Sequence, residues 1–98
     1  MSMSSDFSMS VVQQEKCLQI QIRGSLDGSA VQQLLYTLCQ YVDLFPLIVI
    51  NTDGVFHVEA FGLNLLRYNL EIMKRSTEQF KFTGNHAPVF QSLINRII

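Results

Sequence analysis

The sequence has no tryptophan, only two cysteines and two prolines, and few charged side chains. Charged residues make up 15% of the 98 residues, and seven basic against eight acidic side chains leave a net charge of −1. Without a basic excess the chain cannot neutralise a phosphate backbone, so we expect no nucleic-acid partner. The longest uninterrupted apolar run, Leu47–Ile50, is far shorter than the ~20 residues of a membrane span, so we expect no direct membrane insertion.

Cys17 and Cys39 form no CxxC pair and have no histidine nearby, so we expect no metal site. We predict that both are buried free thiols in a reducing compartment. The Ser-rich first ten residues lack a cationic region and a long apolar stretch, so we expect no secretory signal and a cytoplasmic protein. Residues 1–6 are predicted to form a disordered tail and residues 7–98 one domain.

Hydrophobic residues reach 48% and include seven phenylalanines, which excludes a disordered chain. Apolar residues alternate with polar ones in two early segments that are separated by a short polar turn, and this pattern predicts a hairpin. Strands and helices then alternate along the chain. The predicted elements are strands over 7–12 and 18–23, a helix from 29 to 41–45, a strand over 47–50, a helix from 60 to 74 or 75, a strand over 80–82 and a helix over 88–98.

The order ββαβαβα predicts an α/β domain with a mixed, partly parallel four-stranded sheet and helices packed against it. Ser29 and Gln32 have the spacing of a capping box at the start of the first helix. The run Leu47–Ile50 is typical of a central strand that is covered on both faces. Asn51–Gly54 is predicted to be a turn.

The second predicted helix carries two apolar stripes on roughly opposite sides. A sheet can cover only one of them, so a neighbouring helix must cover the other or it is exposed for a partner. The first stripe comprises Leu63, Leu66, Leu70 and Met73, and the second comprises Phe61, Leu65, Tyr68 and Ile72.

Catalytic signals are weak. The sequence contains no GxSxG, HExxH, Walker A or GxGxxG pattern, and His57 and His86 are predicted in different loops. Asp53 and Glu59 could meet near a helix start, although capping is the commoner role of such acidic residues. We therefore expect no enzyme, no catalytic residue, no metal and no cofactor. The enzyme alternative predicts a concave polar pocket at His57, Glu59 and Asp53.

Three segments resemble the STAS domain of bacterial anti-sigma factor antagonists. Ile20–Asp27 resembles the strand and Gly-x-Leu-Asp turn of that family, and Leu47–Val55 resembles its buried strand and following loop. Val58–Leu63 is similar to the apolar-Asp-Ser-x-Gly-Leu signature at the start of its second helix. Phe82–Gly84 fits the end of the last strand, so that the resemblance covers about residues 7–98.

The sequence departs from the family where the family is regulated. The resemblance places Ala60 at the phosphorylatable serine, Glu59 at the preceding aspartate, and Asn51 at an aspartate that usually ends the buried strand. Alanine has no hydroxyl, so reversible phosphorylation cannot occur at residue 60. Ser25, Thr52 and Thr83 are other hydroxyls at which a modification could occur.

The resemblance implies a non-enzymatic regulator that acts in transcription by partner switching. It would bind an anti-sigma factor or a kinase-like protein through the start of the second helix. The residues implied are His57, Glu59, Ala60, Phe61, Leu65 and Tyr68. Two alternatives stay open. The chain could be an accessory STAS subunit of a bacterial lipid-transport ABC complex, with an ABC transporter subunit as its partner, or an enzyme or small-ligand-binding protein that uses His57, Glu59 and Asp53. Exposed Phe and Leu side chains could also form a homodimer.

Overall fold

The structure is a computed structural model that describes residues 7–73 and 79–95. Its elements follow the predicted order ββαβαβα. The predicted tail over 1–6 and the predicted helix ends at 74–75 and 96–98 lie outside the described residues. The elements are β1 (Ser8–Gln13), β2 (Cys17–Leu26), α1 (Gly28–Tyr41), β3 (Leu47–Val58), α2 (Ala60–Met73), β4 (Phe80–Thr83) and α3 (Ala87–Asn95).

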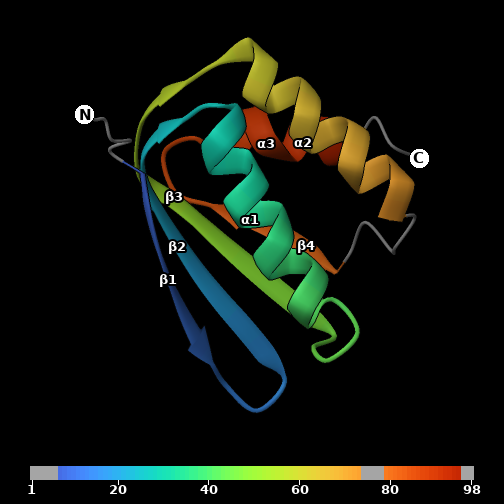
Figure 1. Cartoon of the computed structure of the whole chain (residues 1–98). Coiled ribbons are helices and arrows are strands. Elements are labelled where there is room, and N and C mark those ends of the chain that lie inside the picture. The colour runs from blue at the N-terminus through green and yellow to red at the C-terminus, as the bar shows by residue number, and fades with distance from the viewer. Residues whose placement is uncertain (1–6, 74–78, 96–98) are drawn as a thin grey trace.

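The four strands form one mixed sheet in the order β1-β2-β3-β4 (Figure 1). β1 pairs with β2 antiparallel through a short turn, which confirms the predicted hairpin. β2 pairs with β3 in parallel, and β3 pairs with β4 in parallel. Parallel neighbours need a crossover, and α1 and α2 supply the two crossovers.

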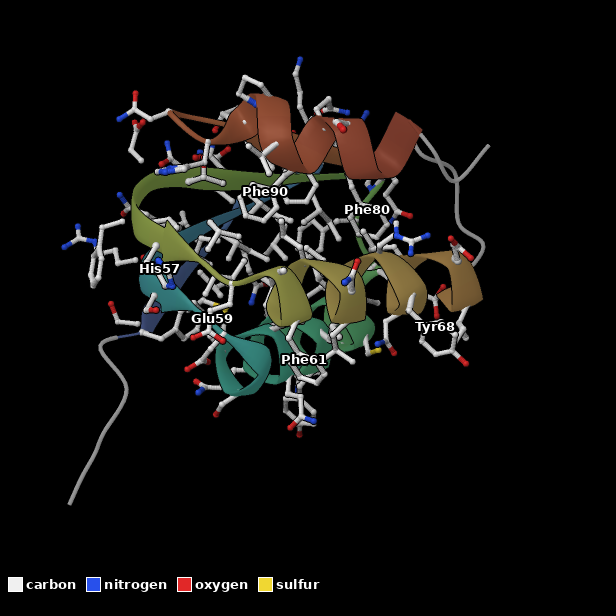
Figure 2. The ribbon with its side chains drawn as sticks, turned by 90° about the horizontal axis from the view of Figure 1, so that it is seen from above. His57, Glu59, Phe61, Tyr68, Phe80 and Phe90 are labelled. Carbon is white, nitrogen blue, oxygen red and sulfur yellow. The ribbon has the colours of Figure 1, made fainter. Side chains whose placement is uncertain are left out.

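Helices cover one face of the sheet. Ile20, Ile50 and Phe82 are paired across three neighbouring strands, and all three are buried beneath the helices. Phe90 of α3 stacks on Phe82 with ring centroids 5.1 Å apart, which places α3 over the same face as α1 and α2. Figure 2 shows Phe80 and Phe90 pointing into the interior. The sheet therefore has one buried face and one face that no described helix covers, which we call the open face.

The prediction that Leu47–Ile50 is covered on both faces is wrong. Ile48 and Ile50 are fully buried, but Leu47 and Val49 point to the open face and are only half-buried. Val49 lies between Gln19 and Lys81 in the register of the strands. The long side chains of these two neighbours, and not a helix, therefore flank Val49 on the open face. The strand is central, as predicted, in a sheet that helices cover on one side.

Asn51–Gly54 is not a turn, because β3 runs through it as a bulged strand. Gln21 pairs with Asn51 whereas Arg23 pairs with Gly54, so Thr52 and Asp53 together face a single residue of β2. The Asn51 side chain accepts a hydrogen bond from the Asp53 N–H at 2.9 Å. Residues that favour turns also suit a bulge, which bends a strand without ending it.

The first helix begins earlier than the predicted capping box. Asp27 is the N-cap, and its carboxylate accepts the Ala30 N–H at 2.9 Å. Its carbonyl oxygen accepts the Val31 N–H at 2.9 Å. Because β2 ends at Leu26, the chain enters α1 at once, and Ser29 lies inside the first turn.

Both cysteines are free, as predicted, but the prediction that they are buried is wrong. Cys39 is exposed on α1 and Cys17 is half-buried at the start of β2. Cys39 follows the buried Leu38 on α1, and a step of ~100° along a helix turns its side chain towards solvent.

Candidate functional site

The start of α2 is fixed against the end of β2. The Glu59 N–H donates to the Leu26 carbonyl oxygen at 3.1 Å, and the Glu59 carbonyl accepts the Leu63 N–H at 3.0 Å. Glu59 therefore joins the sheet on one side and the first turn of α2 on the other. These two bonds determine where the predicted site residues lie relative to the sheet.

Gly62 lets α2 approach the β2–α1 connection closely. An ideal Cβ at this position would lie 2.8 Å from the Leu26 carbonyl oxygen and 3.2 Å from the Asp27 carbonyl oxygen. Both neighbours are backbone atoms, which cannot rotate away as a side chain does. The glycine in the Val58–Leu63 segment thus has a packing reason in this fold.

Gly62→Val is expected to lower the free energy of unfolding by about 2 kcal/mol, because the added atoms force the start of α2 away from β2. Urea denaturation followed by circular dichroism measures this loss. Asn64→Val, at an exposed position of the same helix, controls for the cost of a β-branched residue in a helix. Equal losses in the two variants would contradict the close approach.

The two apolar stripes of α2 have different environments. Leu66 and Leu70 are buried in the core and Leu63 is half-buried, which confirms the first stripe as far as the described side chains reach. The second stripe is exposed along most of its length, with Phe61 at 67%, Tyr68 at 62% and Ile72 at 58%. Leu65 is half-buried and packs against the core. We call Phe61, Leu65, Tyr68 and Ile72 the α2 surface.

Figure 2 labels four of the six predicted site residues, namely His57, Glu59, Phe61 and Tyr68. Phe61 and Tyr68 project from the same side of α2, while His57 and Glu59 lie before its first turn. His57, Glu59 and Ala60 are all exposed. The structure thus brings the six predicted residues together along one helix and the strand end that leads into it.

Phe61 is exposed and yet held in place. An ideal Cβ on Gly28 would lie 2.6 Å from Cε2 of Phe61, so the ring edge rests on the backbone at the start of α1. A ring fixed on one side loses little conformational entropy when a partner covers its other side. Phe61 therefore has one ring edge against α1, while most of the side chain is open to solvent.

The α2 surface itself carries no charge. Arg67 and Glu71 lie one turn apart on the flank of the helix and form an ion pair, with Nη1 of Arg67 3.2 Å from Oε2 of Glu71. A contiguous apolar strip with a charged flank is typical of a protein-binding surface. Ile72 extends the strip beyond the predicted residues, and the helical period of the sequence already placed it there.

The enzyme alternative has no geometric support among the described residues. The Asp53 carboxylate accepts the Asn85 N–H at 2.8 Å, and this bond ties the loop before α3 to the bulge of β3. His86 belongs to the same contact, since its Nδ1 lies 3.3 Å from the Thr52 carbonyl oxygen. His57, Glu59 and Asp53 are exposed, and no group of three metal-ligating side chains is found in the described part of the chain.

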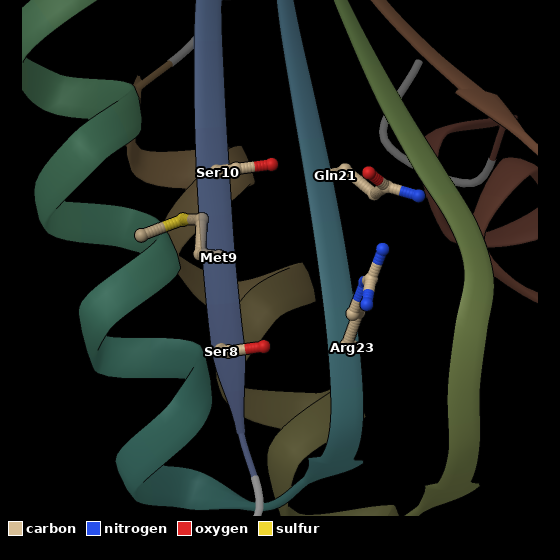
Figure 3. Close-up of a pocket in the computed structure, with 5 residues that line it drawn as sticks. All are labelled: Ser8, Met9, Ser10, Gln21 and Arg23. Atoms are coloured by element: carbon tan, nitrogen blue, oxygen red, sulfur yellow. The ribbon is translucent and has the colours of Figure 1, made fainter.

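Three cavities that described residues line lie around β1, away from the α2 surface. The one drawn in Figure 3 has a volume of about 280 Å³ and is lined by Ser8, Met9, Ser10, Gln21 and Arg23. A second, of about 190 Å³, adjoins it on the open face, and a third, of about 410 Å³, lies between β1 and α1. None of the three is lined by a predicted site residue.

The other hydroxyls differ in accessibility. Thr52 is fully buried, donates to the Thr83 carbonyl oxygen at 2.7 Å and accepts the His86 N–H at 3.1 Å. Such a hydroxyl holds the structure together and is closed to a modifying enzyme. Ser25 and Thr83 are half-buried.

Comparison with known structures identifies the fold. An anti-sigma factor antagonist from Mycobacterium paratuberculosis superposes with a TM-score of 0.68, covering 98% of this chain and 86% of that chain at 19% identity. The fold is STAS-like. No protein-family description and no curated protein matches the sequence. No helix of the described residues in this STAS-like fold is long and apolar enough to cross a membrane.

Proposed function

We propose that this chain is a non-enzymatic, protein-binding regulator that resembles anti-sigma factor antagonists and acts in a bacterial cytoplasm. The exposed, uncharged α2 surface on a STAS-like fold carries the proposal. Its partner is an anti-sigma factor or a kinase-like protein, and binding needs no cofactor. Phe61, Leu65 and Tyr68 form the centre of the contact, and His57 and Glu59 form its rim.

Ala60 makes this regulator permanently competent to bind. A phosphate at the first residue of α2 would add about two negative charges and a hydration shell beside Phe61, and would oppose a dry interface. Alanine leaves that position small and neutral. Partner binding through this surface is therefore controlled by the amount of partner present and not by a phosphate at residue 60.

Tyr68→Asp is expected to remove the partner when the tagged chain is used to capture proteins from the lysate of its own organism. The substitution places a charge in the middle of the α2 surface, where a partner would have to strip it of water. Tyr36→Asp is the matched control, because Tyr36 is a helical tyrosine with similar exposure, 68%, on α1. Circular dichroism establishes that all three proteins are folded.

Mass spectrometry of the captured proteins distinguishes a protein-binding regulator from an accessory subunit of a transporter. A soluble anti-sigma or kinase-like protein that is kept by wild type and Tyr36→Asp but lost by Tyr68→Asp supports the proposal. Transporter subunits that are kept by wild type and Tyr36→Asp but lost by Tyr68→Asp would instead support the accessory-subunit alternative. A partner that all three proteins retain would show that the α2 surface is not the site.

A further inference from the structure

The two edges of the sheet are protected to different degrees. β4 spans only Phe80–Thr83 and carries Lys81, and a short, charged strand pairs poorly with another chain. β1 has six residues, Ser8–Gln13, with no charge, no proline and no bulge. Natural sheets usually blunt their edges with such features, so an edge that lacks them is suited to pairing.

The backbone groups that point outward from β1 can be assigned from the hairpin. The Gln14 N–H donates to the Cys17 carbonyl oxygen at 2.9 Å, which makes these two residues a hydrogen-bonded pair. Hydrogen-bonded pairs alternate along an antiparallel ladder, so Val12, Ser10 and Ser8 point their backbone groups towards β2. Met9, Val11 and Gln13 therefore point theirs away from the sheet. No hydrogen bond joins these outward groups to another described residue.

We propose that the chain forms a two-fold dimer in which the outer edges of two β1 strands pair antiparallel. The outward residues are symmetric about Val11, so the two-fold axis passes between the two Val11 residues. Met9 of each copy then pairs with Gln13 of the other, and every outward N–H and carbonyl of the three residues gains a partner. Within β1, Ser8–Gln13, a shift of two residues in either direction would move one of these three residues past the end of the other copy's strand.

The side chains fit the same register on both faces. On the open face, Ser10 of one copy lies opposite Val12 of the other, and Val12, which is 55% exposed, gains cover. On the helix face, Met9 points towards α1, as Figure 3 shows, and lines the cavity of about 410 Å³ beside Tyr36 and Thr37. The two-fold axis brings two such cavities to face each other, so side chains of both copies can fill the space.

A second copy suits this edge better than an unrelated strand does. Antiparallel pairing of identical strands closes on itself, so the assembly stops at two. The strand is uncharged, so a copy meets no like charge across the edge. The dimer also leaves the α2 surface free, because β1 and α2 lie at different sides of the molecule (Figure 1).

The test introduces charges at Ser10 and Val12 on the open face, where both side chains are exposed and substitution disturbs no core packing. In the proposed register, Ser10→Lys with Val12→Lys places like charges opposite each other twice. Ser10→Lys with Val12→Glu places opposite charges at the same two places. Sedimentation velocity of the full chain at low salt, over a wide range of protein concentration, measures the dimer dissociation constant of each variant. Circular dichroism checks that each is folded.

Wild type is expected to dimerise, and the double-lysine variant to raise the dissociation constant about tenfold. The lysine–glutamate variant is expected to return it to near the wild-type value, since the register pairs the two new charges. Amide hydrogen exchange should show protection at Met9, Val11 and Gln13 that is lost on dilution. A monomer at every concentration, equal weakening by both variants, or a dimer that Tyr68→Asp abolishes would each overturn the proposal.

Discussion

Phe90→Ala is expected to lower the free energy of unfolding by about 3–5 kcal/mol. Phe90 is fully buried and stacks on Phe82 with an interplanar angle of 18°. Truncation removes the buried ring and leaves a cavity beside Phe82 that the surrounding structure can fill only in part. The effect is large because Phe90 is the described α3 side chain that is fully buried in the core.

Urea denaturation monitored by circular dichroism gives the loss as a shift of the midpoint at constant slope. Val89→Ala is the matched control, since Val89 is the preceding residue and is 45% exposed. Its expected cost is below about 0.5 kcal/mol. A loss of less than about 1 kcal/mol for Phe90→Ala would mean that α3 does not pack on β4 as described.

The order of the elements could be predicted because local patterns decide it. Leu18, Ile20 and Ile22 alternate with polar residues along β2, and every one of the three is buried. The alternation specifies a strand with one buried face whatever the rest of the chain does. The buried stripe of α2 that includes Leu66 and Leu70 could be predicted for the same reason, because helical spacing is also a local pattern.

The bulge at Thr52–Asp53 could not be predicted, because partners far along the chain decide it. The turn-forming residues of this segment would suit an ordinary turn in isolation. In the fold, Asp53 receives the Asn85 N–H and Thr52 binds both Thr83 and His86. These contacts join residues more than 30 positions apart, so no local pattern contains them.

The exposure of the second α2 stripe was also left open by the sequence. Periodicity shows that Phe61, Tyr68 and Ile72 share a side of the helix, but not what lies against that side. The answer depends on where α1 and α3 come to lie on the sheet. Both pack so that this side stays exposed, and only Leu65 reaches the core. The edge of β1 was undetermined for the same reason, since strand order is a property of the whole sheet.

Phe61→Asp is expected to weaken binding to the captured partner about 100-fold. The ring edge of Phe61 rests on Gly28, while the rest of the ring is open to solvent. A partner that covers this ring gains an aromatic contact without first having to order it. Aspartate removes the contact and puts a charge in the part of the interface that must become dry. Isothermal titration calorimetry with the purified partner measures the change.

Leu44→Asp provides the control for an added charge at an exposed apolar residue. Leu44 is 68% exposed, against 67% for Phe61, and lies between α1 and β3, away from the start of α2. Leu44→Asp should change the dissociation constant by no more than about twofold, because a surface substitution outside the interface has only a small effect. Ala60→Asp, which adds a charge one residue before Phe61, should weaken binding about tenfold by opposing the dry contact. If Ala60→Asp and Phe61→Asp bind as wild type does, the partner docks elsewhere on this STAS-like domain, and Ala60 has no bearing on its regulation.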